Sequence, residues 1–205
     1  MIKPDQPFIM QQLIEKFKQA VTDLASKESF IHHKWYVKYH LDIVEKIALE
    51  LCELHKAADR NLVVTLVWLH DYGKIIGKSK KETLTEGGKE LMQVGFPRAF
   101  VDKAVEAARL VDKKDRLNEA SIEVQIVSSA DGASHLTGPF QFFYWYENSD
   151  KPFEELVSNN INKLRRDWHK KIVLREVREA FQKRKHYLHE LLGEMPGKFI
   201  IEDHH

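Results

Sequence analysis

The feature of this sequence that most constrains its fold is the helical spacing of apolar residues along almost the whole chain. Between Phe8 and Leu24, apolar side chains recur every three to five residues, with polar residues between them. A second stripe of the same kind runs from Tyr36 to Leu54. An apolar face that repeats in this way is typical of amphipathic helices that pack on a core. The pattern therefore predicts an all-α protein.

The middle of the chain continues the same pattern. Asn61 is a suitable N-cap for a short, fully buried helix over 62–70. A further helix is expected from about Thr85 to Val94, and Pro97 then opens the next one. The segment 122–127 is rich in β-branched residues, which alone would suggest a strand. Because no partner strand occurs elsewhere, we interpret it as a buried helix. We expect one helical domain, with a charged helical hairpin over 153–192 packed on it.

Composition excludes several classes of protein. The 205 residues suffice for one domain with its own core. Lysine and arginine total 32 against 31 acidic residues, and this balance argues against a uniformly basic nucleic-acid-binding protein. The single cysteine, Cys52, excludes a disulfide within the chain and fits a reducing compartment. No apolar run approaches the ~20 residues of a membrane span, and the N-terminus has no secretory signal. We therefore expect a cytoplasmic protein.

Two histidines stand out by their position rather than by their number. The chain has 11 histidines, of which His204 and His205 are either native or the remnant of a tag. His70 is followed by Asp71 where a very apolar helix meets a glycine turn. His40 lies on the inner stripe of its helix, and Asp131 ends another apolar segment. A buried carboxylate is costly unless it is paired or bound to a metal ion.

These side chains are a suitable set of ligands for one divalent cation. Imidazole and carboxylate together suit Mn, Fe, Ni, Co, Zn or Mg, and the ligand types do not decide among them. Four such ligands leave one or two positions open on an octahedral ion, which is typical of a catalytic site. The other interpretation is a buried hydrogen-bonded network without a metal ion.

The order of these residues resembles the H…HD…D signature of the HD-domain metal-dependent phosphohydrolases. The resemblance rests on His40, then His70 and Asp71, then Asp131, and on the Leu-His-Asp-x-Gly-Lys context at the centre. It covers residues 35–150 and implies an all-α HD-type catalytic core there. It also implies that these four residues are the metal ligands. Residues 1–34 would then form an N-terminal helix packed on the core, and 151–205 a charged helical extension of the same globule.

The sequence departs from the fuller forms of this family. Many members carry two additional histidines that allow a second metal ion. The corresponding segments here are 83–86 and 109–112, and neither contains histidine. The resemblance therefore implies a mononuclear site.

Several polar residues are candidates for roles beside the metal ion. Asp71 could orient a metal-bound water, and Glu86 is the best placed additional carboxylate for a general base, although it could equally be a helix N-terminal acid. Lys74 follows the glycine turn and could reach a substrate phosphate, or it could simply close the turn in solvent. Lys78 and Arg109 are further candidates for binding phosphate. His135 follows Asp131 by four residues and could reach the same pocket.

The basic residues are concentrated near the C-terminus. The segment 163–185 holds ten basic and three acidic residues, a local charge of +7 that leaves the remainder of the chain acidic. The simpler interpretation is a solvated amphipathic helix whose apolar residues face inward, namely Ile172, Val173, Val177 and Phe181. The alternative is attraction to a polyanion such as nucleic acid. The aromatic cluster 140–146 is interpreted as core or as a subunit interface, and a homodimer is left open.

The function predicted from the sequence is metal-dependent hydrolysis of a small phosphorylated substrate, with nucleotides among the candidates. One alternative is a non-catalytic HD module that binds a nucleotide or a protein partner. A third is a nucleic-acid-associated protein that uses its basic C-terminal segment.

Overall fold

The fold is entirely helical in the part of the chain that the structure describes. A computed structural model describes residues 6–111, 113–193 and 200, so residues 1–5, Asp112, His204 and His205 lie outside the described residues. No strand occurs in the described ranges, which confirms the all-α prediction. The elements in chain order are α1 (Gln6–Ala25), η1 (Val37–Leu41), α2 (Asp42–Leu54), α3 (Arg60–Leu69), α4 (Tyr72–Ile75), α5 (Lys80–Val94), α6 (Arg98–Val111), η2 (Lys114–Glu119), α7 (Ile122–Ser134), α8 (Phe140–Glu147), α9 (Phe153–Lys170) and α10 (Arg175–Leu192).

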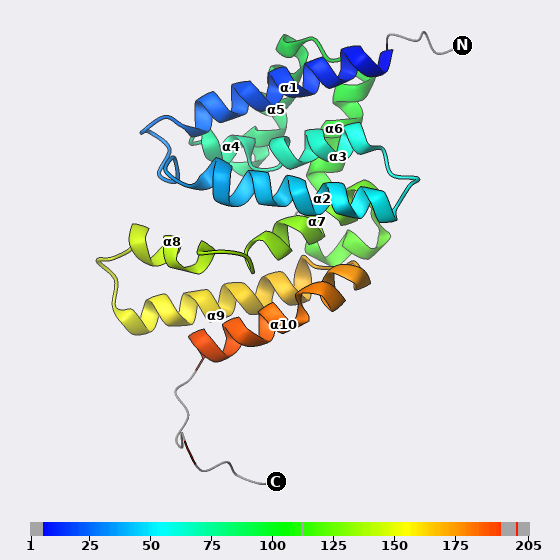
Figure 1. The fold of residues 1–205 in the computed structure, drawn as a ribbon. Coiled ribbons are helices and arrows are strands. Elements are labelled where there is room, and N and C mark those ends of the chain that lie inside the picture. The colour runs from blue at the N-terminus through cyan, green and yellow to red at the C-terminus, as the bar shows by residue number, and fades with distance from the viewer. Residues whose placement is uncertain (1–5, 112, 194–199, 201–205) are drawn as a thin grey trace.

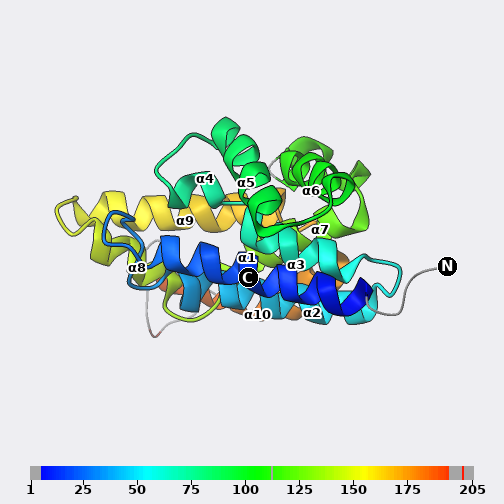
Figure 2. The same cartoon turned by 90° about the horizontal axis from the view of Figure 1, so that it is seen from above.

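The helices are stacked in layers around α3. Figure 1 shows α1 at the top, α2 and α3 below it, then α7, with α9 and α10 at the bottom. Figure 2 shows α4, α5 and α6 along one side of this stack. Helix α3 contacts α1, α2, α6 and α7, and every side chain from Leu62 to Leu69 is buried. A helix that is apolar on all sides must lie at the centre of a helical domain.

Two helix starts differ from the sequence prediction. The N-cap of α3 is Asp59 rather than Asn61, and its side chain accepts a hydrogen bond from the Leu62 amide. Helix α5 begins at Lys80, five residues earlier than expected. Ser79 and Glu82 form a reciprocal capping box there, which satisfies amide groups that the first turn leaves free. The β-branched segment 122–127 is helical within α7, as predicted.

A single π-helical turn lies between the long loop after α1 and helix α2. It spans Val37–Leu41 and buries both His40 and Leu41. A π turn inserts one additional residue into the helical repeat and is frequent at functional sites. The stripe from Tyr36 to Leu54 is therefore two elements, of which the first carries His40.

The C-terminal hairpin packs on α7, as the sequence predicts. Ile172 and Val177 are buried, and Val173 and Phe181 pack partly buried against the same core. The division into segments 1–34, 35–150 and 151–205 stays a prediction. Within the described residues, no helix combines the length and the apolar character that crossing a bilayer requires.

Gly132 offers a test of how tightly the hairpin is packed. A Cβ at this position would lie 2.9 Å from Ile172 Cγ1 and 3.0 Å from Lys171 Cβ. Glycine to alanine in a helix ordinarily stabilises by about 1 kcal/mol. For Gly132→Ala we expect the opposite sign, a loss of about 1–3 kcal/mol, because α7 and the segment between α9 and α10 must separate. Urea denaturation measures this difference, and a more stable variant would contradict the close packing.

Candidate metal centre

The His70–Asp71 pair lies where the buried helix α3 ends. His70 is the C-cap residue of α3, and α4 begins one residue after Asp71. The chain turns closely here, because the Gly73 amide donates to Thr83 Oγ1 at 2.9 Å. A Cβ on Gly73 would lie 2.0 Å from that oxygen, so only glycine fits. The turn therefore holds both polar side chains of the pair at the end of the apolar helix.

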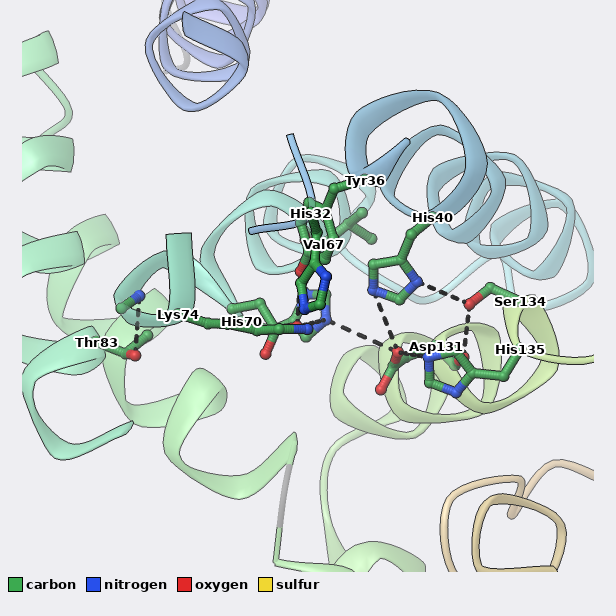
Figure 3. A network of polar contacts seen from close by, with 12 residues as sticks. His32, Tyr36, His40, Val67, His70, Lys74, Thr83, Asp131, Ser134 and His135 are labelled. Atoms are coloured by element: carbon green, nitrogen blue, oxygen red, sulfur yellow. Dashed lines mark hydrogen bonds and ion pairs between the residues drawn. The ribbon is translucent and has the colours of Figure 1, made fainter. Parts of the chain in front are cut away.

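Three of the four residues predicted as ligands form a compact buried group. His40, His70 and Asp131 each offer one ligand atom, and these three atoms lie within 4.8 Å of one another. The Nε2 atoms of His40 and His70 lie 3.6 and 3.9 Å from the same atom, Asp131 Oδ1. Figure 3 shows the two rings pointing toward this carboxylate from η1 and from the end of α3, while Asp131 comes from α7.

The hydrogen bonds behind these rings fix where their protons are. Ser134 Oγ donates its proton to the Asp131 carbonyl at 2.8 Å, so it accepts from His40 Nδ1 at 3.1 Å. His70 Nδ1 donates to the Val67 carbonyl at 2.7 Å. In neutral imidazoles the Nε2 atoms then carry only lone pairs. Both lone pairs are directed at an anionic oxygen, and His70 Nε2 is buried without a hydrogen-bond partner.

Such an arrangement of acceptors fits a cation. Lone pairs that face a carboxylate oxygen across a short gap repel one another unless a positive ion lies between them. Metal-bound histidines ordinarily donate their second ring N–H to a protein acceptor, as both do here. The residues present therefore fit a divalent metal ion.

Asp131 is held ionised by the cations around it. Burial alone would raise the pKa of this carboxyl, but the Lys171 ammonium and the adjacent histidines keep it well below its usual value. Lys171 forms its ion pair with the second oxygen, Oδ2. Oδ1 therefore stays directed at the two imidazoles. Burial correspondingly lowers the pKa of His40, so this ring is neutral near pH 7.

Asp71 lies next to the compact group and outside it. Its Oδ2 accepts a hydrogen bond from the Tyr36 hydroxyl at 2.7 Å and lies 3.5 Å from Lys74 Nζ. The same oxygen is 3.8 Å from His70 Nε2. Burial raises the pKa of Asp71, but His70 and Lys74 outweigh this and lower it. The ionised Asp71 carboxylate therefore lies beside the compact group of His40, His70 and Asp131, on the side of Lys74.

A cavity of about 310 Å³ opens above these side chains. One wall is aromatic, and three lysines from two parts of the chain reach it. Lys74 comes from α4, whereas Lys163 and Lys171 come from the C-terminal hairpin. The lining residues are His32, Trp35, Tyr36, His40, Asp71, Lys74, Asp131, His135, Phe140, Tyr144, Glu147, Lys163 and Lys171.

Three residues predicted from the sequence do not line this cavity. Glu86 pairs with Lys89 on α5 at 2.8 Å, Lys78 lies 4.0 Å from Glu82, and Arg109 lies 3.5 Å from Glu106 on α6. The geometry gives no support to the catalytic role considered for Glu86, or to phosphate binding by Lys78 and Arg109. Of the predicted phosphate-binding residues, Lys74 alone is a lining residue.

Sequence reasoning missed most of the cavity wall. Lys163 and Lys171 were counted within a solvated basic segment, and the aromatic cluster was assigned to the core, although Phe140 and Tyr144 line the cavity. His32 also lines the cavity, where its Nδ1 lies 2.7 Å from Glu147 Oε2. His135 was the exception among these wall residues. It follows Asp131 by four residues, a spacing that places two polar side chains on one helix face.

Two histidines and an aspartate that come together from separate helices are a set of ligands suited to a divalent metal ion. Residues 37–135 match the model of the HD domain. The match confirms the resemblance based on His40, His70, Asp71 and Asp131. Together with the buried His-His-Asp group, it indicates binding of a divalent metal ion. Neither the curated proteins nor the solved structures gave a match to this chain.

Proposed function

We propose that this protein is a metal-dependent phosphohydrolase that acts on a small phosphorylated molecule through a mononuclear site. One observation carries the proposal. The bare Nε2 atoms of His40 and His70 converge on Asp131 Oδ1 at the floor of a cavity that lysines line. His40, His70 and Asp131 would hold the ion, and Asp71 is close enough to join them or to act through a bound water.

The chemistry divides between the metal ion and the side chains around it. A divalent ion polarises a phosphoryl oxygen and lowers the pKa of a bound water. Asp71 is ionised and lies beside His40, His70 and Asp131, so it can accept a hydrogen bond from that water and orient it. Tyr36 donates to Asp71 and thereby fixes the direction of the carboxylate.

Lys74 is the side chain best placed to bind the transferred phosphoryl group. Its ammonium lies 4.9 Å above the Tyr36 ring and 3.5 Å from Asp71, with nearly half of the side chain exposed to the cavity side. It can therefore move toward an incoming anion without losing buried contacts. Lys163 and Lys171 reach the cavity from the opposite side, where they form ion pairs with the buried carboxylates of Asp167 and Asp131. The half-exposed Lys74 and the bound metal ion are therefore the groups that would attract an anionic substrate.

The aromatic wall supports a substrate that has a flat ring next to its phosphate. Phe140 and Tyr144 line the cavity, and Trp35 stacks on Phe143 behind them with ring centroids 4.8 Å apart. A cavity of about 310 Å³ suits a molecule of small-ligand size. A nucleotide combines these features, and we propose nucleotides as the first substrates to test.

The activity is tested with a panel of phosphate esters and nucleotides in the presence of Mn, Co, Ni or Mg. For Asp71→Ala we expect the rate of hydrolysis to fall by about 100-fold or more, because the carboxylate that orients the metal-bound water is lost. Asp102→Ala on α6 is the matched control, since this exposed carboxylate forms an ion pair with Arg98 at 2.9 Å on the surface.

The outcomes separate the candidate functions. Full activity of Asp71→Ala would contradict the site assignment. Metal binding without turnover of any ester would instead favour a non-catalytic HD module that binds a nucleotide or a partner. We do not propose a nucleic-acid partner, because Lys163 and Lys171 of the basic segment are directed into the cavity.

A further inference from the structure

His135 has the geometry of an additional metal ligand. It is the C-cap residue of α7 and lies four residues after Asp131, so both side chains share one face of the helix end. Only 6 % of His135 is exposed, and it lines the cavity. Its Nε2 lies 3.5 Å from Asp131 Oδ1, the same oxygen that His40 and His70 approach at 3.6 and 3.9 Å. Figure 3 shows these three rings arranged around that carboxylate.

The hydrogen bonding of His135 leaves its Nε2 unprotonated, as it does the Nε2 atoms of His40 and His70. Its Nδ1 lies 2.8 Å from Asp167 Oδ2, a contact that requires a proton on Nδ1. Lys163 Nζ donates to the same carboxylate at 2.9 Å and lies farther, at 3.2 Å, from Nδ1. A neutral imidazole has one proton, so Nε2 then presents a lone pair to Asp131.

The partner of Nδ1 is itself well suited to a ligand histidine. Asp167 comes from α9, is 1 % exposed and belongs to the C-terminal hairpin rather than to the matched domain. A carboxylate that accepts the second N–H of a metal-bound histidine fixes its tautomer and makes it a stronger ligand. In each of the three rings, Nδ1 thus donates to a protein acceptor and Nε2 faces the same oxygen, Asp131 Oδ1.

We propose that His135 is a third imidazole ligand of the metal ion, positioned by Asp167. This inference rests on the metal site of the proposed function and goes beyond the four ligands implied by the HD signature. His135 lies outside the compact group whose atoms are within 4.8 Å of one another, so binding of the ion draws its ring inward.

A third imidazole changes which metal ions the site prefers. Imidazole is a better ligand for Co, Ni, Zn and Fe than for Mg, which favours carboxylate, carbonyl and water oxygens. A site with three histidines therefore binds Co²⁺ or Ni²⁺ much more tightly than Mg²⁺. It also makes the C-terminal hairpin part of the metal centre, since Asp167 lies 32 residues beyond His135.

The test counts the imidazoles on the ion without using a substrate. In Co²⁺-loaded protein, each bound histidine gives one strongly shifted, solvent-exchangeable Nδ1–H proton resonance. We expect three such resonances in the wild-type protein and two in His135→Gln, with Co²⁺ affinity about 10–100-fold lower in the variant. Asp167→Asn keeps the ring and is expected to lose affinity by a similar factor. Calorimetric titration measures these affinities.

His32→Gln is the matched control, because His32 lines the same cavity and bonds a carboxylate, that of Glu147, away from Asp131. It should keep three resonances and unchanged affinity. Two resonances in the wild-type protein would overturn the inference, even if His135→Gln failed to fold. Three resonances with no hydrolysis would keep the inference and contradict the proposed function. Absence of Co²⁺ binding would overturn both.

Discussion

Replacing Asp131 with asparagine should lower the affinity for divalent metal ions by at least about 100-fold and remove any hydrolytic activity with it. Asp131 Oδ1 is the atom on which His40 and His70 converge, at 3.6 and 3.9 Å. The variant loses the only charged ligand of the compact group. An amide oxygen carries no net charge, so it offsets far less of the cost of burying a dication. This loss of metal affinity exceeds the 10–100-fold loss ordinarily seen when a residue that hydrogen-bonds to a metal ligand is replaced.

Calorimetric titration with Co²⁺ or Ni²⁺ after chelator treatment measures this effect. The matched control is Asp102→Asn, which removes an exposed carboxylate of α6 in an ion pair with Arg98. Unfolding curves of the metal-free proteins show whether the variant is folded before titration. A folded Asp131→Asn protein that binds the ion as tightly as the wild type would refute the assignment of the metal centre.

The metal-free protein should lose stability steeply when the pH falls from about 6.5 to 4. Burial, reinforced by the nearby Lys163 ammonium, lowers the pKa of His135 from its ordinary value of 6.5 to about 4. Between these values the unfolded chain binds a proton that the folded chain does not. Acidification therefore favours unfolding, and stability rises with pH in this window. The shift corresponds to about 3 kcal/mol for His135 alone, and burial of His40 acts in the same direction.

Urea denaturation at pH 7 and pH 4.5, with chelator present, measures the difference. The lower pH lies above the ordinary aspartate pKa of 3.8. Aspartates whose pKa is lowered in the folded protein, such as Asp131, therefore contribute little to the change in unfolding free energy between these two pH values. His135→Gln should reduce the pH dependence of the free energy of unfolding. Equal stability of the wild-type protein at both pH values would contradict a neutral buried His135.

The fold and the centre of the site could be predicted because their signals are local. Helical spacing predicts the all-α class, and even the β-branched segment of α7 could be assigned correctly from the lack of a partner strand. His40, His70 and Asp131 are polar residues at positions where the pattern requires apolar ones. A buried polar group must be satisfied, so such positions point to a shared site. Helix starts were less certain, because Asp59 and Asn61 are both suitable caps and only packing selects between them.

The cavity wall could not be predicted, because it depends on how the C-terminal hairpin docks. In the sequence, Lys163 and Lys171 are two of ten basic residues in a charged segment, and nothing local distinguishes them from the solvated ones. Docking of α9 on α7 brings Lys171 to Asp131 and Asp167 to His135. Glu86 and Arg109 show the converse, since both are suitable residue types but neither lines the cavity, and each pairs instead with a neighbour on its own helix.

From the amino-acid sequence alone it follows that this chain is helical, that it carries the HD signature, and that His40, His70 and Asp131 belong together. These properties follow from side-chain periodicity and from the cost of burying polar groups, which act residue by residue. The folded structure was needed to show that Asp71 lies beside the compact group, that His135 approaches the same oxygen of Asp131, and that the hairpin lines the cavity. The hairpin contacts join Asp167 to His135 and Lys171 to Asp131, which are 32 and 40 positions apart, so the packing of whole helices sets their distances.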